Sequence, residues 1–585
     1  MNWLSEFWQR LRTNDQVILS VLAIGVGLAA GYGSIGFRLV IAELQFFLFG
    51  DGGEQLATIA RALPAWQIVL VPTLGGLLVG IIVAYVLPGK VPAGVPDVIE
   101  AAALHSGRMS LRNSLAATAL SAGSIACGAS VGREGPIVHL GAAIGSYVAR
   151  YVDLNAPLTR TLLGCGTAAG VAAAFNAPIA GVFFALEVVV GHYGLGAFSP
   201  VVLASVMGTM ISRIHFGEDV AFVVSETGIT SFWEMPAFLL LGLLCGGVAV
   251  GMMRGVGLVQ QAHDRLATPK VLRPVLAGLV VGLLAISYPE ILGVGYEATD
   301  NALHGHYALH LLIVLAILKA AASCLCLGSL FGGGWFSPAL FVGAMVGGAF
   351  GIVAGGIFPA LASSPATYAL IGMGAVAGSV LGAPISTTIM IFELTSNYGV
   401  AFALMVSTAV AAVLSKEVFG HSVFTYMLEL RGISLSRSRD RALIQHRRVI
   451  DVMRTDHQAV AKDTSLHEVG ERLRRSLAPV YVSDPEGTFV GTIAFDDFLQ
   501  ATSGAGIEKP PRNAGELARR PRASLRVDDN LMRALQLFES SGETQLPVVD
   551  TRKPPRVVGR LNHRDVLLVY NQALLHARAI ERGDD

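Results

Sequence analysis

The feature that most constrains this chain is a series of long apolar runs. Six of them approach the roughly 20 residues of a membrane-spanning helix, at residues 15–48, 67–87, 196–213, 236–259, 271–288 and 308–329. Charged residues make up only 14% of the 585 residues, against roughly 25% in a soluble domain. Because lipid satisfies no backbone hydrogen bond, such runs must fold as helices. The sequence therefore predicts an all-α, multi-pass membrane domain over residues 15–432.

Shorter apolar pieces interrupted by Gly and Pro lie among these runs, at residues 94–104, 155–168, 175–189, 338–356 and 382–394. Helices too short to cross lipid must be shielded inside protein. Broken helices at matching places in two halves are typical of transporters built from inverted repeats around a midplane site. We therefore expect two related halves, about 15–214 and 233–432.

Two landmarks support this division. The segment from Asn176 to Glu187 aligns without gaps on the segment from Gly382 to Glu393, which lies 206 residues later. Pro136 and Pro338 each close a Gly-rich helix start and are 202 residues apart. The two offsets are nearly equal, as an internal repeat requires.

An acidic residue, Glu134, lies within a helix-start signal formed by Gly132, Gly135 and Pro136 in the middle of apolar sequence. An ionisable carboxylate at membrane depth is costly and is a functional-site hypothesis by default. Helix N-termini attract anions through free N–H groups and the positive end of the helix dipole. Glu134 would compete with a diffusible anion for such a site and so act as a gate. The alternative is an ordinary first-turn acid that favours its helix dipole.

Four motifs in order resemble the CLC family of chloride channels and chloride/proton exchangers. They are Gly-Arg-Glu-Gly-Pro at 132–136, Phe-Asn-Ala-Pro at 175–178, Gly-Gly-Trp-Phe-Ser-Pro at 333–338 and Phe-Glu-Leu-Thr-Ser-Asn-Tyr at 392–398. The resemblance implies the CLC fold, with chloride or a similar anion bound near helix N-termini. It also implies a homodimer in the lipid bilayer with one pore per subunit.

Backbone N–H groups at Gly-rich helix starts supply partial positive charge without a full cation, so an anion can enter and still leave. The alternative for Gly332–Gly334 is a flexible turn. We expect ten residues at three helix starts and the last helix to line the anion path: Ala93, Gly94, Gly132, Arg133, Glu134, Gly135, Gly334, Trp335, Phe336 and Phe424.

Two of these residues depart from the family pattern. Ala93 stands where the resemblance implies a serine hydroxyl on the ion, and Phe424 stands where it implies a tyrosine hydroxyl. Tyr426 replaces that tyrosine only if the helix register shifts by two residues. Each lost donor to an ion removes roughly 1.5–3 kcal/mol. The hypothesis is a weaker central anion site, with the preference among chloride, nitrate and other anions left open.

A third departure concerns proton coupling. The resemblance implies a second, inner glutamate in exchangers, and Val188 occupies that position after Glu187. Valine carries no proton, so we predict a channel in which Glu134 is a gate sensitive to protons and anions. The alternative is an antiporter that uses His192, which shares a face with Val188 if the helix continues. Gly191 indicates that the helix ends first.

Three further charges lie in apolar helices. Glu187 and Glu393 have the same spacing from their Ala-Pro turns, and we interpret both as structural acceptors of main-chain hydrogen bonds. Lys319 is interpreted as a paired or snorkelling structural charge.

The ends of the membrane domain are expected in the cytoplasm of a cell-membrane protein. Residues 1–14 form a polar segment before a retained first span, because no small-residue cleavage site follows. Beyond Leu430 the chain becomes rich in arginine, at Arg431, Arg437, Arg439, Arg441, Arg447 and Arg448. By the positive-inside rule this end is cytoplasmic, and residues 433–447 are predicted to be a basic linker.

A tandem repeat follows, over residues 448–502 and 513–576, with a tail at 577–585. Each copy has a helix, two strands and a closing helix: 466–477, 480–482 and 488–493 in the first, then 531–540, 545–549 and 557–561 in the second. The closing Asp497 and Asp565 are 68 residues apart. This α/β unit resembles a pair of cystathionine-β-synthase-type (CBS) domains.

The resemblance to CBS pairs implies a site for an adenine nucleotide, built from a Ser or Thr and an Asp three residues later. The matching residues are Ala494 with Asp497, and Asn562 with Asp565, so the hydroxyl is missing from both copies. Each aspartate is equally explained as a helix N-cap. No other cofactor is expected.

The remaining motifs exclude several function classes. Five scattered cysteines form no disulfide framework or metal spacing. There is no nucleophile–base pairing and no phosphate-binding lysine loop, so we expect no enzyme, and nothing suggests a nucleic-acid partner. A membrane-anchored sensor that signals through its CBS tail is the alternative from a different class. Broken helices favour transport, because an anchor has no use for them.

Overall fold

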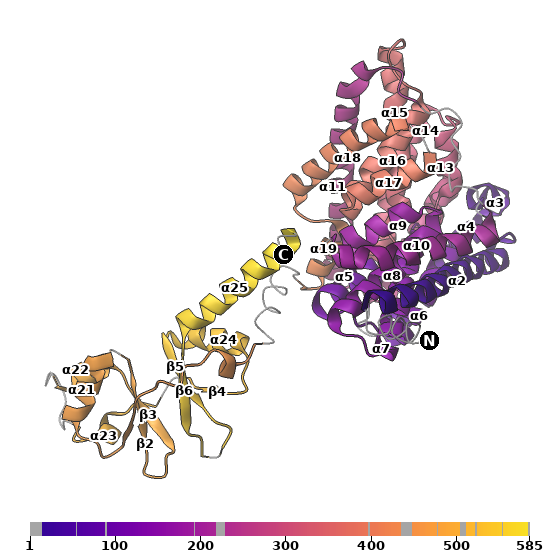
Figure 1. The fold of residues 1–585 in the computed structure, drawn as a ribbon. Coiled ribbons are helices and arrows are strands. Elements are labelled where there is room, and N and C mark those ends of the chain that lie inside the picture. Colours follow the sequence, from indigo (N-terminus) through magenta and orange to yellow (C-terminus); the bar gives the residue numbers. More distant parts are fainter. Residues whose placement is uncertain are drawn as a thin grey trace, which may run out of the picture. The chain divides into compact units, whose positions relative to one another are not determined.

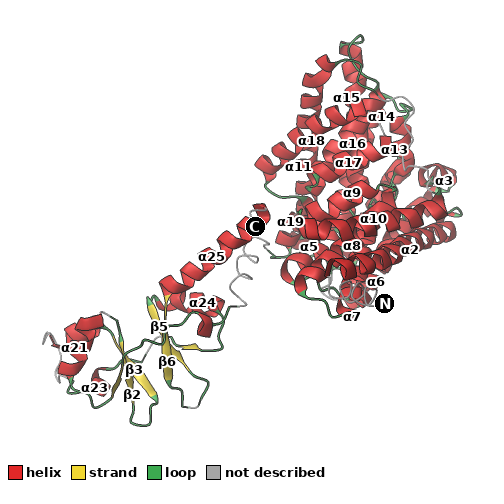
Figure 2. Ribbon diagram, viewed as in Figure 1, coloured by secondary structure: helices red, strands yellow, loops and turns green. Residues whose placement is uncertain are grey.

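The computed structural model describes residues 15–53, 55–87, 91–191, 193–217, 228–395, 398–433, 447–476, 478–502, 511–520, 523–552 and 554–582. The predicted N-terminal segment 1–14, His192, nearly all of the linker 433–447 and the end of the tail lie outside these residues. The chain divides into two compact units, Met1–Leu435 and Ser436–Asp585 (Figure 1). In the described residues, the first unit consists of helices, whereas the second combines helices and strands (Figure 2).

The first half of the membrane domain runs through α2 (Asp15–Phe49), α3 (Leu56–Ala62), α4 (Ala65–Tyr85), α5 (Val95–Leu104), α6 (Leu111–Ala126), α7 (Glu134–Tyr151), α8 (Ala156–Phe175), α9 (Pro178–Phe184), its π-helical continuation η2 (Ala185–Val190), and α10 (Leu195–Phe216). The second half comprises η3 (Phe232–Glu234), α11 (Met235–Arg265), α12 (Leu272–Ala285), η4 (Pro289–Ile291), α13 (Tyr296–Leu303), α14 (Leu309–Gly328), α15 (Phe336–Ile357), α16 (Pro365–Leu381), α17 (Pro384–Thr395), α18 (Tyr398–Phe419) and α19 (Val423–Leu430). Within the described residues, eight helical stretches are long and apolar enough to cross a membrane. The all-helical membrane domain predicted from the apolar runs is confirmed.

Two of the pieces predicted to be short are full-length helices. The predicted 155–168 and 338–356 belong to α8, of 20 residues, and α15, of 22 residues. Their glycines are packing points rather than breaks. A Cβ built on Gly343 of α15 would lie 2.4 Å from the carbonyl oxygen of Gly372 on α16, so glycine lets these two helices pack closely.

Helix α6 was not predicted, because it is rich in small and hydroxyl-bearing residues rather than in large apolar ones. Two of its buried hydroxyls are satisfied within the helix. Ser121 and Ser124 of α6 donate to the carbonyl oxygens four residues earlier, each at 2.9 Å. A buried helix can therefore carry a polar composition that hydropathy alone does not identify.

The two halves correspond as predicted. Helix α7 packs along α8 in the first half, and α15 packs along α16 in the second. The residue that ends α8 is Asn176, with φ of 57°, and the residue that ends α16 is Gly382, with φ of 67°. Both adopt the left-handed conformation that closes a helix, at the two positions that the repeat aligns.

The second unit contains two copies of one small α/β fold. The first has β1 (Ala459–Ala461), α21 (Leu466–Ser476), β2 (Val480–Ser483), β3 (Phe489–Ile493), α22 (Phe495–Thr502) and α23 (Ala514–Leu517). The second has β4 (Leu525–Arg526), α24 (Leu531–Ser541), β5 (Gln545–Val549), β6 (Val557–Asn562) and α25 (His563–Arg582). In each sheet the first strand pairs in parallel with the second, which pairs antiparallel with the third. The leading strands β1 and β4 were missed because they are only three and two residues long.

The copies exchange segments. Val449, at the start of the first copy in the sequence, is buried in the core of the second with Leu531 and Leu561. Leu517 packs against the core of the first copy. Because each core is completed by the other copy's leading segment, the two copies form one unit.

Candidate functional site

The starts of two helices from different halves are joined by main-chain hydrogen bonds. Gly132 precedes α7 and Gly334 precedes α15, and each N–H donates to the other's carbonyl oxygen at 2.8 Å. The residues so paired are 202 apart, the offset of the internal repeat. This bridge places the N-termini of α7 and α15 side by side, where their free N–H groups favour an anion.

The approach requires residues without a side chain. A Cβ built on Gly135 would lie 2.9 Å from the Cα of Gly334. A Cβ built on Gly132 would lie 2.8 Å from a carboxylate oxygen of Glu134. The glycines therefore make room both for the crossing of the two chains and for the carboxylate beside it.

Glu134 is the first residue of α7 and its side chain is fully buried. Its two oxygens accept from different partners. The hydroxyl of Tyr296, at the start of α13, donates to Oε1 at 2.7 Å, and the hydroxyl of Ser337, in α15, donates to Oε2 at 2.5 Å. The Nε of Arg133 lies 3.9 Å from Oε1, and its guanidinium carbon lies 4.5 Å from the centre of the Tyr296 ring.

The sequence analysis missed Tyr296 and Ser337. Ser337 lies inside the Gly-Gly-Trp-Phe-Ser-Pro motif, so its position near a helix start could be predicted from the sequence. Its contact with Glu134 could not. Tyr296 lies outside every motif, and only the tertiary structure brings it to Glu134.

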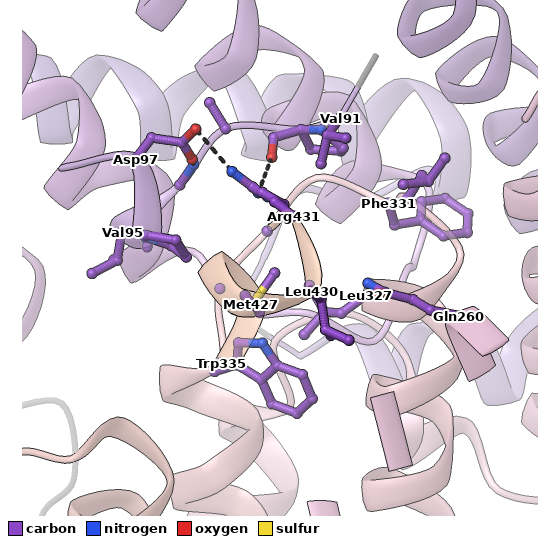
Figure 3. A pocket seen from close by; sticks show the side chains of 18 of the residues that line it. Val91, Val95, Asp97, Gln260, Leu327, Phe331, Trp335, Met427, Leu430 and Arg431 are labelled. Carbon is purple, nitrogen blue, oxygen red and sulfur yellow. Dashed lines mark hydrogen bonds and ion pairs between the residues drawn. The ribbon is translucent and has the colours of Figure 1, made fainter. Parts of the chain in front are cut away.

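Two cavities lie next to this carboxylate. The wider one, of about 510 Å³, is shown in Figure 3. It is lined by six of the predicted site residues, Ala93, Gly94, Gly135, Gly334, Trp335 and Phe424. The smaller one, of about 250 Å³, is lined by Arg133 and Tyr296 among others. The neighbours of Glu134 in the chain, Arg133 and Gly135, thus line different cavities.

Two of the predicted residues, Phe336 and Gly94, have further contacts. Phe336 is buried between Phe175 and Phe184, with ring centres 4.9 and 5.6 Å away, so it braces the start of α15. The N–H of Gly94 donates to its own helix, at 2.7 Å from Oδ2 of Asp97. That amide is therefore engaged by Asp97, although Gly94 lines the wider cavity.

The last helix, α19, presents Phe424 to the wider cavity. Tyr426 points elsewhere, because its ring packs on Phe419, with centres 4.9 Å apart, and its hydroxyl lies against Gly257. The structure therefore places Phe424, and not Tyr426, on the predicted path. Ala93 lines the same cavity, so both expected hydroxyls are missing from it.

Charged side chains also line the wider cavity. Arg431, directly after α19, donates to Asp97 at 3.0 Å and to the carbonyl oxygen of Pro92 at 3.3 Å (Figure 3). Lys270 and Arg273 also line it, and Arg273 is paired with Asp264, another lining residue, at 2.8 Å. The lining thus carries three cations and two acids, and this small excess of positive charge favours anions.

The two acids interpreted as structural accept hydrogen bonds across the repeat. Glu187 accepts from the N–H groups of Ile385 and Ser386 at 3.1 and 2.9 Å. Glu393 accepts from the N–H groups of Ile179 and Ala180 at 2.9 and 2.7 Å. Each half thus caps a helix N-terminus of the other.

Val188 lies half-buried in the π-helical turn η2. This helix ends at Val190, where Gly191 has φ of 77°. The end that Gly191 indicated is therefore present. His192, the predicted alternative proton carrier, falls outside the described residues.

In the tail, both predicted nucleotide aspartates accept from arginines. Asp497 accepts from Arg519 at 2.8 Å and from the N–H of Ala494 at 3.3 Å. Asp565 accepts from Arg454 at 2.9 and 3.0 Å and from the side chain of Asn562 at 2.9 Å. The Arg454 guanidinium holds the pKa of the Asp565 carboxyl below its usual value.

Comparison with known proteins identifies both units. Residues 75–416 match the family model of voltage-gated chloride channels, and residues 449–504 and 514–571 match that of the CBS domain. A putative chloride channel protein ClcB-like from Ralstonia nicotianae is 36% identical over 422 residues, which cover 72% of this chain and 96% of that protein. The H⁺/Cl⁻ exchange transporter ClcA from Vibrio parahaemolyticus is 28% identical over 435 residues, which cover 73% of this chain and 92% of that protein.

Solved structures agree. A slow cyanobacterial Cl⁻/H⁺ antiporter superposes with a TM-score of 0.62 at 26% identity, covering 72% of this chain and 98% of that one. A eukaryotic CLC transporter superposes with a TM-score of 0.60 over 94% of this chain and 97% of that one, and at 18% identity shows the fold alone. The chain therefore belongs to the CLC family of chloride channels and chloride/proton exchangers, as a multi-pass membrane protein that carries a pair of CBS domains.

Proposed function

We propose that this protein conducts chloride across the membrane through a path that Glu134 closes. The observation that supports this most directly is a fully buried carboxylate at the start of α7 whose two neighbours in the chain line separate cavities. An ionised carboxylate there occupies the region of positive potential that an anion would use. When Glu134 is protonated or swings away, the two cavities connect.

We infer channel behaviour from the residues around position 188, where an exchanger would carry its inner glutamate. Val188 carries no proton, Glu187 is engaged by the start of α17, and η2 ends before residue 192. The described residues near η2 thus supply no free carboxylate to pass protons onward. The antiporter is the second candidate, since a cyanobacterial Cl⁻/H⁺ antiporter and a bacterial exchanger are among the similar proteins.

One measurement separates the two candidates. Purified protein in a planar bilayer is placed under combined chloride and pH gradients, and the reversal potential is recorded. A channel reverses at the chloride equilibrium potential whatever the pH gradient. A reversal potential that follows the proton gradient as well would establish the antiporter, and its loss on His192→Ala would locate the proton route.

The gate itself is tested by Glu134→Gln. The amide cannot ionise, so chloride flux into proteoliposomes should become high and independent of pH. A variant that keeps the chloride flux and acid response of the unaltered protein would refute the gate.

We place the wider cavity on the cytoplasmic side. Arg431 opens the arginine-rich stretch that follows α19, and it lines this cavity. Excess Lys and Arg next to the last span favours the cytoplasm. The N- and C-terminal segments would then both be cytoplasmic, in a cell-membrane protein.

We further propose a homodimer with one pore per subunit. Glu134, its two hydroxyl partners and the lining of both cavities come from a single chain, so a dimer would contain two complete pathways. Single-molecule photobleaching of labelled protein in liposomes should give two steps.

Nucleotide binding by the CBS pair stays a prediction, since a ligand would have to displace the arginines now bonded to Asp497 and Asp565.

A further inference from the structure

The carboxylate of Glu134 is held from two directions by residues of the second half. Tyr296 donates to Oε1 from the start of α13, and Ser337 donates to Oε2 from the start of α15. Both partners are themselves buried, with 7% and 2% of their surface exposed. Each oxygen thus has one hydroxyl donor in a site closed to bulk water.

We propose that Tyr296 and Ser337 are positioning residues that form a latch on the gate. The latch holds the ionised carboxylate of Glu134 in the blocking position and sets the pH at which the path opens. This inference rests on the proposed gate function and adds the residues that control it.

Hydrogen-bond chemistry gives the latch its preference for the charged form. An ionised carboxylate only accepts, so both oxygens can receive a hydroxyl, and bonds to a charged acceptor are the stronger ones. A protonated carboxyl turns one oxygen into a donor. Protonation of Glu134 therefore weakens the contact with at least one hydroxyl and releases the side chain.

The Tyr296 side of the latch is rigid. The turn before it is fixed by the buried Lys319, whose Nζ donates to the carbonyl oxygens of Ile291 and Gly293 at 3.0 and 2.8 Å. Gly295 then takes φ of 88°, and a Cβ there would meet the ring of Phe341 at 2.7 Å. The tyrosine is thereby directed at the gate, with the Arg133 guanidinium over its ring.

The Ser337 side is fixed by the main chain. Ser337 is the second residue of α15, three residues beyond Gly334, which is bonded to Gly132 in both directions. The bridge between the halves thus sets the separation of Ser337 from Glu134. Tyr296 and Ser337 need not move for the gate to open, because only the Glu134 side chain must leave the blocking position.

The experiment measures chloride efflux from proteoliposomes as a function of pH for the full-length protein and for Tyr296→Phe, Ser337→Ala and both together. Removing a donor destabilises the ionised, blocking state. The midpoint of acid activation should therefore move to higher pH, by about 0.5–1 unit for each hydroxyl. Ser337→Thr keeps the hydroxyl and should restore a midpoint near that of the unaltered protein.

Two matched controls remove comparable hydrogen bonds elsewhere. Tyr368→Phe deletes a hydroxyl that donates to the buried Glu234 at 3.0 Å. Ser407→Ala deletes one that donates to the carbonyl oxygen of Phe238 at 2.7 Å. Both should leave the midpoint unchanged. A variant that does not elute as a single species is replaced by Tyr296→Leu or Ser337→Gly.

The outcomes separate the latch from the gate. If Glu134→Gln abolishes the acid response while Tyr296→Phe and Ser337→Ala keep the original midpoint, the latch is wrong and the gate stands. If Glu134→Gln keeps the acid response, the proposal that Glu134 is the gate is wrong, and the latch proposal, which depends on it, is wrong as well. A shift to lower pH in either hydroxyl variant also overturns the latch.

Discussion

At the scale of single residues, the missing hydroxyls of the wider cavity are the most informative departures from the family pattern. Ala93 and Phe424 face that cavity, and neither side chain can donate to an anion. Trp335 also lines it, and its buried indole nitrogen has no hydrogen-bond partner among the described residues. Of these three side chains, only the Trp335 indole can donate a hydrogen bond to an ion.

Restoring one hydroxyl should strengthen anion binding. We expect Ala93→Ser to lower the chloride dissociation constant about tenfold or more, since a hydrogen bond to an ion is worth roughly 1.5–3 kcal/mol. Isothermal titration calorimetry in detergent measures it, with Ala103→Ser, in α5 and off the cavity lining, as the control. Sub-millimolar chloride binding by the unaltered protein would contradict the weak-site hypothesis.

The residue scale also shows the limit of sequence motifs. The helix-start signal around Glu134 was sufficient to predict a buried carboxylate at a helix N-terminus, because Gly, Pro and an acid in apolar sequence carry that information locally. Tyr296 could not be found this way. It is 162 residues from Glu134 and reaches it only through the turn that Lys319 fixes.

At the scale of elements, the halves are held together by reciprocal caps. Glu187 caps α17 and Glu393 caps α9. In each case an acid on one half satisfies two N–H groups at a helix start of the other, where the helix dipole favours negative charge. The identical spacing of the two acids in the sequence thus reflects one interaction repeated by pseudo-symmetry.

Removing a cap should destabilise the membrane domain without opening the pathway. Glu393→Ala leaves the N–H groups of Ile179 and Ala180 without their carboxylate, which costs about 1–3 kcal/mol. We expect a lower thermal unfolding temperature in detergent, while the pH dependence of flux by the folded protein stays the same. Glu429→Ala, at an exposed carboxylate, is the control. An unfolding temperature unchanged in Glu393→Ala would show that the cap contributes no stability.

Hydropathy predicts some membrane-domain helices well and misses others. Helices such as α2, α4 and α14 touch lipid on one side, so their sequences are strongly apolar and their bounds were predicted within a few residues. Helix α6 is rich in small and hydroxyl-bearing residues, so hydropathy did not identify it. Helix α16 is apolar and nearly all buried, but its 17 residues are fewer than a membrane span needs.

At the scale of the whole molecule, the membrane domain and the tail are separate compact units. In the tail, Arg454 near the start of the first copy donates to Asp565 near the end of the second, and Gln545 donates to the hydroxyl of Tyr481 across the copies at 2.9 Å. Together with the exchanged leading segments, these bonds make the CBS pair one cooperative unit.

The Arg454–Asp565 pair predicts the acid behaviour of the tail. Arg454 lowers the pKa of the Asp565 carboxyl in the folded state. The pair therefore contributes stability above the unfolded pKa of about 3.9, and this contribution is lost as pH falls below it. We expect Arg454→Met to lower the unfolding temperature of residues 436–585 at pH 7 and to flatten its decline below pH 5.

Differential scanning fluorimetry from pH 3 to pH 8 checks this. Arg533→Met removes an exposed arginine of α24 that lies 3.4 Å from Asp529, just before that helix. It should change little, because surface ion pairs of that kind contribute weakly. Parallel acid profiles for Arg454→Met and the unaltered tail would exclude a role for the pair.

The sequence by itself determined the membrane domain, its two halves, the tandem tail and the acidic helix start. Each of these follows from local composition, from helix-start residues or from an internal repeat. The tertiary structure alone decided which groups face the carboxylate, which aromatic ring lines the cavity and which half caps which helix. Those relations join residues about 160 to 210 positions apart or depend on the register of a short helix, and no local pattern encodes such distances.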